Sequence, residues 1–376
     1  MCNMSENNKQ IGYLSVLRVL ACISIVILHC FKYSCSLAND RIFIISDIQM
    51  NISLIVQFVM NWAVPCFVMV TGALLLDKDR HITYKKIFGK YILKILIVIV
   101  VFGVLFELID TLLSNDNITI FIITKGLKEA ALNQSWIHMW YLYMLIAIYL
   151  MLPLFRKITE NASKKDMLYL LVLLGVFLIG FDIVFNGIIQ SLIITSQNES
   201  LRTELQAISN PAFYIFLQKI WPLYLFLGYA VHKEIIKIKS VISIILIVCG
   251  ISFITFFILL QKTAASEAVK SISYVLYSFN SSPGFLLIAL GAFSLAHSLR
   301  NLKSGILFKI VRQIDICSFG IYLVHIIPIK IIMAKLRFNP YEYGGVFGVL
   351  WFSIAVLIIS FAVIWIIKRI PVLKKL

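Results

Sequence analysis

The sequence lacks the short motifs that identify most nucleotide-dependent and hydrolytic enzymes. It contains no P-loop, no G-x-G-x-x-G, no H-E-x-x-H and no G-x-S-x-G. Acidic residues are scarce as well, with 18 aspartates and glutamates against 34 lysines and arginines. The few acids inside apolar runs, such as Glu107 and Asp182, form no convincing catalytic carboxylate pair. These absences argue against an ATP-driven pump and against a serine hydrolase.

Cysteine usage and net charge exclude further classes. The seven cysteines are odd in number and include no C-x-x-C, so the sequence indicates no disulfide framework and no metal site. A formal charge of +16 would suggest nucleic acid in a soluble protein. Here the basic residues are dispersed among short loops between apolar runs, without a basic stripe. We therefore expect no nucleic acid partner.

Apolar residues dominate what is present. They make up 61% of the chain, and the mean hydropathy is +0.95. A run of about 20 apolar residues spans the hydrocarbon layer, and in lipid such a run must be helical because its backbone polar groups need partners. We expect an all-α integral membrane bundle of about ten helices, over residues 12–32, 52–76, 91–113, 137–155, 168–186, 212–231, 241–260, 284–299, 316–336 and 347–367.

The orientation follows from the lysines and arginines of the loops. Alternate loops and the two chain ends carry twenty-one of them, and the remaining loops carry seven. The positive-inside rule then places both termini in the cytoplasm and makes the number of spans even. We expect a single transmembrane domain over residues 1–376 without an appended soluble domain, and a first helix that is retained rather than cleaved.

The first span carries two polar residues, Arg18 and His29, eleven positions apart. At 100° per residue this spacing is about three turns, so both side chains share one face, about 16 Å apart along the axis. An arginine inside a span is costly unless it meets water, a partner or a ligand. The alternative is a snorkelling arginine and an interfacial histidine. The spacing nevertheless predicts a functional face with Arg18 near the cytoplasm and His29 nearer the outside.

Two further histidines fall in or beside spans. His138 begins the fourth span, with Tyr141 on the same face. An aromatic interfacial belt would also explain that cluster. His325 lies near the middle of the ninth span, three residues after Tyr322, so the two side chains can face one cavity. A histidine at that depth favours a functional role.

Four patches in chain order carry a family resemblance. They are Arg18 with His29, the stretch Pro65–Gly72, the stretch His138–Pro153, and the block Ser318–His325. Together they make the chain resemble the membrane-bound acyltransferase 3 family, which includes bacterial surface-polysaccharide O-acetyltransferases. Mid-run Pro65 also predicts a kink in the second span.

The resemblance implies a ten-helix fold in the bacterial inner membrane and O-acetylation as the chemistry. The donor would be cytoplasmic acyl-coenzyme A, with acetyl-coenzyme A as the expected form, and the acceptor a hydroxyl of a surface polysaccharide or lipid-linked sugar. His29 would then act as general base, and Arg18 would bind the donor or polarise its thioester. Residues expected to bind or orient substrate are His138, Trp140, Tyr141, Tyr322 and His325.

The chain departs from the family pattern in the loop before the third helix. Family members often carry Arg-x-x-Arg there, whereas this sequence offers lysines, among them Lys86 and Lys90. Lysine binds phosphate as a point charge without the two-pronged contact of arginine, so these two are weaker donor-binding candidates.

Two other functions fit the composition. A polysaccharide exporter should show inverted repeats or paired broken helices, and only one proline break and no repeat is evident. A sensor would need larger external loops than those near 114–136, 187–211 and 261–283. The acyl group, the acceptor and the oligomeric state stay open from sequence alone.

Overall fold

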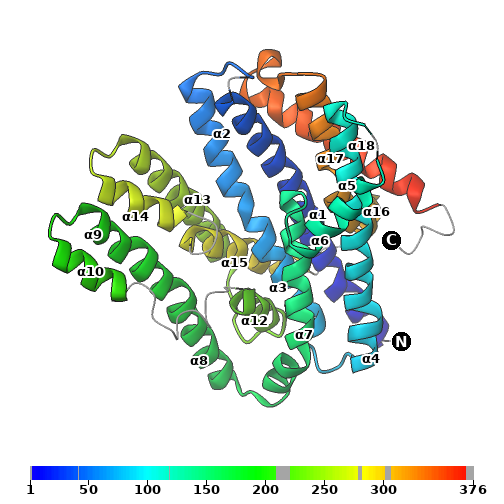
Figure 1. Cartoon of the computed structure of the whole chain (residues 1–376). Coiled ribbons are helices and arrows are strands. Elements are labelled where there is room, and N and C mark those ends of the chain that lie inside the picture. The colour runs from blue at the N-terminus through cyan, green and yellow to red at the C-terminus, as the bar shows by residue number, and fades with distance from the viewer. Residues whose placement is uncertain are drawn as a thin grey trace.

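A computed structural model describes residues 2–40, 42–117, 119–208, 221–277, 282–300 and 306–369. These residues form helices and connecting loops, with no strand among them (Figure 1). The prediction of an all-α membrane bundle is therefore confirmed.

The helices of the first half of the chain are built partly from irregular segments. Their bounds are α1 Cys2–Asn39, α2 Asp47–Val59, η1 Met60–Trp62, α3 Ala63–Leu75, α4 Tyr84–Lys86, η2 Ile87–Ile92, α5 Leu93–Ser114, α6 Phe121–Ala131, η3 Ile137–Met139, α7 Trp140–Asn161, α8 Lys164–Gly175, η4 Val176–Gly180, η5 Ile183–Ile189, α9 Gln190–Thr195 and α10 Glu199–Ile208. Ser46 and Ser163 begin α2 and α8 with capping boxes, so the sequence itself marks these two starts.

The second half contains fewer interruptions. Its elements are α12 Trp221–His232, α13 Ser240–Thr263, α14 Glu267–Tyr277, α15 Pro283–Ser298, α16 Ile306–Val324, α17 Ile326–Ile329, η6 Lys330–Lys335, η7 Pro340–Tyr343 and α18 Val346–Ile367. Three helices, α6, α10 and α14, lie where the sequence suggested only external loops. They are too short to span a membrane, so long apolar runs in the sequence do not indicate them.

Seven helices among the described residues are long and apolar enough to cross a membrane, and a bent pair brings the number to eight. The expected span 284–299 appears as α15, a shorter apolar helix. The expected span 212–231 is described from Trp221 onward, and the rest of it lies outside the described residues. The expected number of about ten spans is therefore approximate, and the chain is a multi-pass membrane protein.

Helix α1 is the central helix of the bundle, which explains why its polar residues matter. It contacts α2, α3, α15, α16 and α18, and 72% of its most apolar stretch is buried inside the protein. A span surrounded by protein can carry polar side chains at depth because they face other helices and not lipid. Arg18 and His29 both belong to this helix.

The second span runs from Asp47 to Leu75 and changes its hydrogen-bond pattern just before Pro65, where the sequence predicts a kink. Proline cannot donate to the carbonyl four residues earlier, here that of Asn61. The chain forms a short 3₁₀ turn, η1, at that point and resumes as α3. Further along α3, Gly72 packs against α12 so closely that a Cβ there would lie 1.9 Å from the carbonyl oxygen of Leu225. Gly228 makes the matching approach to Met69, so Gly72 serves packing.

The ninth span differs from expectation. It begins at Ile306, ten residues before the predicted start, and it bends by 48° between its two halves. His325 is the single residue between α16 and α17. The cause is Pro328, which cannot donate to the carbonyl of Val324 and so interrupts the hydrogen-bond ladder there. The bend places His325 at a break in the helix.

Candidate active site

Two histidines from distant parts of the chain meet inside the bundle. Nε2 of His325 lies 2.9 Å from Nδ1 of His29. Each Nδ1 also lies 3.1 Å from the carbonyl oxygen four residues earlier in its own helix, that of Ile25 or Ile321. Both side chains are buried. The break after α16 and the central position of α1 together create this pair.

The hydrogen bonds select one neutral tautomer for each ring. A carbonyl oxygen only accepts, so Nδ1 carries the proton in both His29 and His325. In the neutral state the one Nδ1 proton of His29 is then shared between the carbonyl oxygen of Ile25 and Nε2 of His325. Nε2 of His29 keeps its lone pair, and it has no hydrogen-bond partner among the described residues. This nitrogen is suited to accept a proton.

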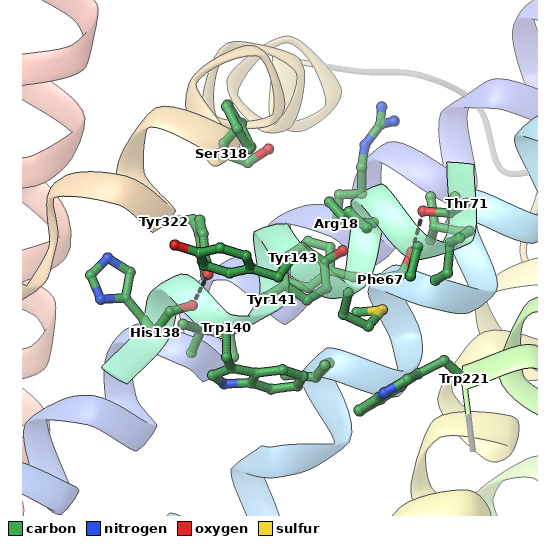
Figure 2. A pocket seen from close by; sticks show the side chains of 18 of the residues that line it. Arg18, Phe67, Thr71, His138, Trp140, Tyr141, Tyr143, Trp221, Ser318 and Tyr322 are labelled. Atoms are coloured by element: carbon green, nitrogen blue, oxygen red, sulfur yellow. Dashed lines mark hydrogen bonds between the residues drawn. The ribbon is translucent and has the colours of Figure 1, made fainter. Parts of the chain in front are cut away.

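His138 completes a cluster of three imidazoles. Its ring centroid lies 5.4 Å from that of His325 and 6.3 Å from that of His29. Nε2 of His138 donates to the carbonyl oxygen of Leu323 at 3.2 Å, which leaves its Nδ1 as a buried acceptor without a partner in the described structure. Tyr322 donates its hydroxyl to the backbone carbonyl of His138 (Figure 2). An unpaired buried acceptor is costly and is a common mark of a functional site.

The segment before His138 is braced from two sides. Trp136 stacks on Phe106 with ring centroids 4.0 Å apart, and its Nε1 donates to Asp110 at 2.7 Å. Lys330 reaches the other oxygen of Asp110 at 2.5 Å and lies 4.2 Å from the centroid of the Trp136 ring. The bent ninth span and the third span therefore both hold the start of η3 in place.

Arg18 has a partner that the sequence did not reveal. Its Nε and Nη2 atoms donate to the two carboxylate oxygens of Asp315 at 2.6 and 2.7 Å, and Nη2 also lies 3.4 Å from Oγ of Ser15. The geometry is bidentate and joins α1 to α16, with Asp315 nearly buried. This pairing offsets much of the cost of an arginine inside a span. Nη1 of Arg18 makes no hydrogen bond with the described residues.

A cavity of about 1250 Å³ connects these groups. Arg18, Asp315 and Arg80 line one part of it, and His29, Lys32 and Asn133 line another. Arg80 lies in the loop before the third span and Asn133 in the loop after it, so the cavity lining includes residues from both ends of that span. His325 does not line the cavity, but its ring lies against the lining residues His29 and His138.

Aromatic rings form much of the cavity wall. Figure 2 shows Trp140 and Tyr141 of α7 and Trp221 of α12 beside the same space, and all three line the cavity. The centroids of Trp140 and Trp221 lie 5.4 Å apart, and those of Tyr141 and Tyr322 lie 5.5 Å apart. Flat aromatic faces offer apolar area with fixed orientation.

The lysines expected to bind the donor lie elsewhere. Lys90 is exposed and Lys86 half-buried, and neither lines the cavity. Nζ of Lys86 instead lies 5.9 Å from the ring centroid of Tyr91. The remaining expected residues, Arg18, His29, His138, Trp140, Tyr141 and Tyr322, all line the cavity.

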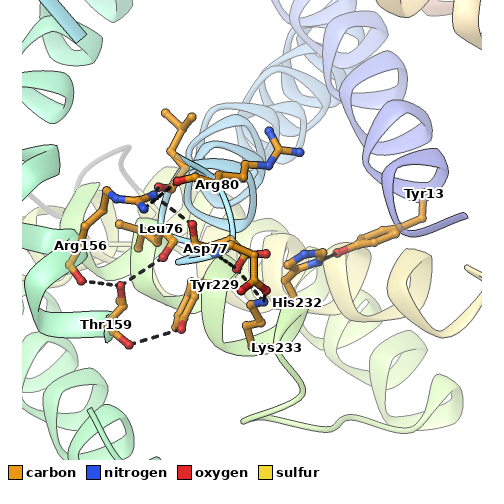
Figure 3. Close-up of polar contacts among 11 residues, drawn as sticks. Tyr13, Leu76, Asp77, Arg80, Arg156, Thr159, Tyr229, His232 and Lys233 are labelled. Carbon is orange, nitrogen blue, oxygen red and sulfur yellow. Dashed lines mark hydrogen bonds and ion pairs between the residues drawn. The ribbon is translucent and has the colours of Figure 1, made fainter. Parts of the chain in front are cut away.

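Arg80, unlike Lys86 and Lys90, lines the cavity. Its loop is fixed by Arg156, which donates to the carbonyl oxygens of Leu75, Asp77 and Arg80 at 2.6, 3.0 and 2.8 Å (Figure 3). Lys233 adds a 2.7 Å ion pair to Asp77. Burial acts to raise the pKa of Asp77, but the hydrogen bond and charge of Lys233 outweigh it and lower that pKa.

Sequence reasoning missed Lys32, Arg80, Asp315 and Trp221 as cavity residues. Lys32 carried a usable signal, because it stands three residues after His29 inside the same apolar run. Arg80 resembled any other loop cation, and Asp315 any acid at a helix end. Their roles depend on which helices meet, which a single sequence does not specify.

Comparison with known protein families gives one match, an acyltransferase domain family that covers residues 11–369. No curated protein and no solved structure matched the chain. The matched region contains the three histidines, Arg18 and Asp315, and spans nearly the whole chain. The chain therefore belongs to the acyltransferase 3 family and is a multi-pass membrane acyltransferase.

Proposed function

We propose that the protein moves an acyl group, acetyl in the simplest case, from cytoplasmic acyl-coenzyme A to a hydroxyl of a surface polysaccharide or lipid-linked sugar. The observation that carries the proposal is the cavity, which joins cationic residues at Arg18 and Arg80 to the base nitrogen of His29. One helix, α1, holds both Arg18 and His29, about 16 Å apart along its axis. A donor and an acceptor entering from opposite sides would meet between them.

His29 acts as the general base in this proposal. The acceptor oxygen attacks the thioester carbonyl carbon while Nε2 of His29 takes the hydroxyl proton. The carbon–sulfur bond then breaks as the carbonyl re-forms, and the imidazolium returns the proton to the leaving thiolate. The acyl ester and the free thiol are the products, and His29 ends neutral.

His325 is the positioning residue for that base. Its Nε2 accepts the Nδ1 proton of His29 at 2.9 Å, which holds the required tautomer and strengthens as the ring gains charge. A carboxylate performs this task in the Ser-His-Asp triad. A neutral histidine does so here without placing a negative charge in the interior of the membrane.

The donor binds at the Arg18 end. Coenzyme A carries several phosphate charges, and guanidinium groups bind phosphate through paired hydrogen bonds. Nη1 of Arg18 has no partner within the described structure, and the exposed side chain of Arg80 has no ion pair there. Arg156 fixes the backbone of Arg80 at the cavity edge.

The acceptor sugar binds beside the histidines. Trp140 and Trp221 present flat surfaces for the apolar face of a sugar ring. His138 also lines the cavity beside them, with its unpaired Nδ1 buried.

The test is acyl transfer by the purified protein in proteoliposomes that contain extracted host glycan and radiolabelled acetyl-coenzyme A. We expect His29→Ala to abolish transfer while insertion and elution volume stay normal. His81→Ala, at an exposed histidine outside the cavity, is the matched control and should retain full activity. Full transfer by His29→Ala would refute the mechanism. Glycan movement without acylation would instead favour an exporter.

A further inference from the structure

Lys32 is a cation inside the bundle that the acyl-transfer chemistry above does not use. It lies on α1, one turn beyond His29, and both residues line the same cavity. The side chain is half-buried and makes no hydrogen bond or ion pair with the described residues. A snorkelling lysine would point along the lipid-facing surface, whereas Lys32 lines the interior of the protein.

The surroundings of Lys32 are polar but carry no acid. Gln57, Asn61 and Asn133 line the cavity on the same side of the bundle. In the described lining the one carboxylate is that of Asp315, which Arg18 already holds. Arg18 and Lys32 are about 21 Å apart along the helix axis, so Asp315 does not neutralise Lys32.

Two acids near the end of α5 are also engaged. Glu107 accepts from Lys125 at 2.6 Å, and Asp110 accepts from Lys330 at 2.5 Å. Burying an amine without a counter-charge costs free energy, and a ligand that supplies the charge recovers it. The cavity therefore offers an unmatched positive charge beside the base nitrogen of His29.

We propose that Lys32 binds an anionic group on the acceptor, so that the substrate is a negatively charged sugar derivative. The inference rests on the proposed function for the identity of the reaction. A phosphate ester on a lipid-linked sugar and a carboxylate on an acidic sugar have the same chemistry for an ammonium group. Adjacent side chains one helical turn apart are about 5–6 Å apart at Cβ, so the anionic group lies next to the reacting hydroxyl.

The binding test uses the full-length protein in phosphatidylcholine nanodiscs and follows the fluorescence of the cavity tryptophans, Trp140 and Trp221. Two matched probe pairs distinguish the sources of charge: farnesyl phosphate with farnesol, and glucuronate with glucose. We expect one anionic probe to bind at least tenfold more tightly than its neutral partner. The pair that shows this preference identifies a phosphate or a carboxylate acceptor.

Variants of Lys32 decide whether that preference belongs to this site. Lys32→Gln should remove it and Lys32→Arg should keep it. Lys128→Gln, at an exposed lysine of α6 outside the cavity, should leave it unchanged. Should Lys32→Gln not fold, Lys32→Met supplies an apolar side chain of similar length. A missing preference in the unmodified protein, or one that survives in Lys32→Gln, would overturn the proposal.

Failure of the proposed acyl-transfer function would be seen in a different measurement from failure of the Lys32 proposal. Acetyl-coenzyme A binding, measured in the same nanodiscs, should be unchanged in Lys32→Gln because the donor phosphates lie at the Arg18 end. If the unmodified protein neither binds nor uses acetyl-coenzyme A, the acyl-transfer proposal fails, and the probe pairs still report on Lys32.

Discussion

Nε2 of His325 accepts the Nδ1 proton of His29 at 2.9 Å, and the two residues are 296 positions apart in the chain. The contact requires α1 at the centre of the bundle and a break in the ninth span at His325. Both rings also donate to carbonyl oxygens of their own helices, so neither can rotate without losing a hydrogen bond. The two rings therefore have a fixed arrangement. Of their four nitrogens, Nε2 of His29 alone has no hydrogen-bond partner among the described residues.

Replacing His325 tests whether this residue positions His29 without itself transferring the proton. We expect His325→Ala to lower kcat by about 100-fold with a small effect on KM, because the base keeps its place on α1 but loses the acceptor that stabilises its imidazolium form. His325→Gln, which retains an acceptor, should recover part of the rate. Steady-state kinetics in proteoliposomes measure this. Equal rates for the alanine variant and the unmodified protein would remove His325 from the mechanism.

The contact between α3 and α12 makes a stability prediction. Gly72→Ala should lower the thermal midpoint strongly, because the new Cβ would fall 1.9 Å from the carbonyl oxygen of Leu225 and the helices must separate. Gly175→Ala is the matched control, since a Cβ there meets nothing within 4 Å. An alanine in a helix is favoured over glycine by about 0.5–1 kcal/mol. Thermal unfolding in detergent should show opposite signs for the two variants.

The sequence alone predicts the membrane bundle, because the apolar runs leave few alternatives in lipid. It also places Arg18 and His29 on one face from spacing alone. It does not reveal that Asp315 pairs with Arg18, since that contact joins residues 297 positions apart. The bend at His325 was missed although Pro328 carried the signal, because the apolar run continues through it without interruption.

Two further features could not be predicted from the sequence: the short helices, and which cations line the cavity. Helices α6 and α14 lie in segments that hydropathy assigns to loops, and their burial depends on partners elsewhere in the chain. Lys86 and Lys90 were expected at the donor site from their place in the family pattern, whereas the cavity edge is formed by Arg80. The loop geometry set by Arg156 decides this, and loop geometry is not visible in a sequence pattern.

The ion pair between Arg18 and Asp315 can be tested by a double-mutant cycle. Asp315→Asn alone should destabilise the protein by roughly 1–3 kcal/mol, because it leaves the arginine charge without its partner. Arg18 is partly exposed, which places the expected value toward the lower end. The double variant Arg18→Met with Asp315→Leu should lose less than the sum of the single changes. Additive losses would mean that the pair is not coupled.

Donor binding provides the last test, and it separates Arg80 from the two lysines first expected there. Arg80→Gln should raise KM for acyl-coenzyme A about tenfold, because one charge-assisted hydrogen bond contributes roughly 1.5–3 kcal/mol and the site is partly open to solvent. Lys86→Gln and Lys90→Gln should leave that KM unchanged, since neither side chain lines the cavity. Each of the three variants removes one positive charge from the same side of the bundle. A general electrostatic effect would therefore raise KM by a similar factor in all three. A rise in KM confined to the lysine variants would return the donor site to the α4–η2 segment and exclude Arg80.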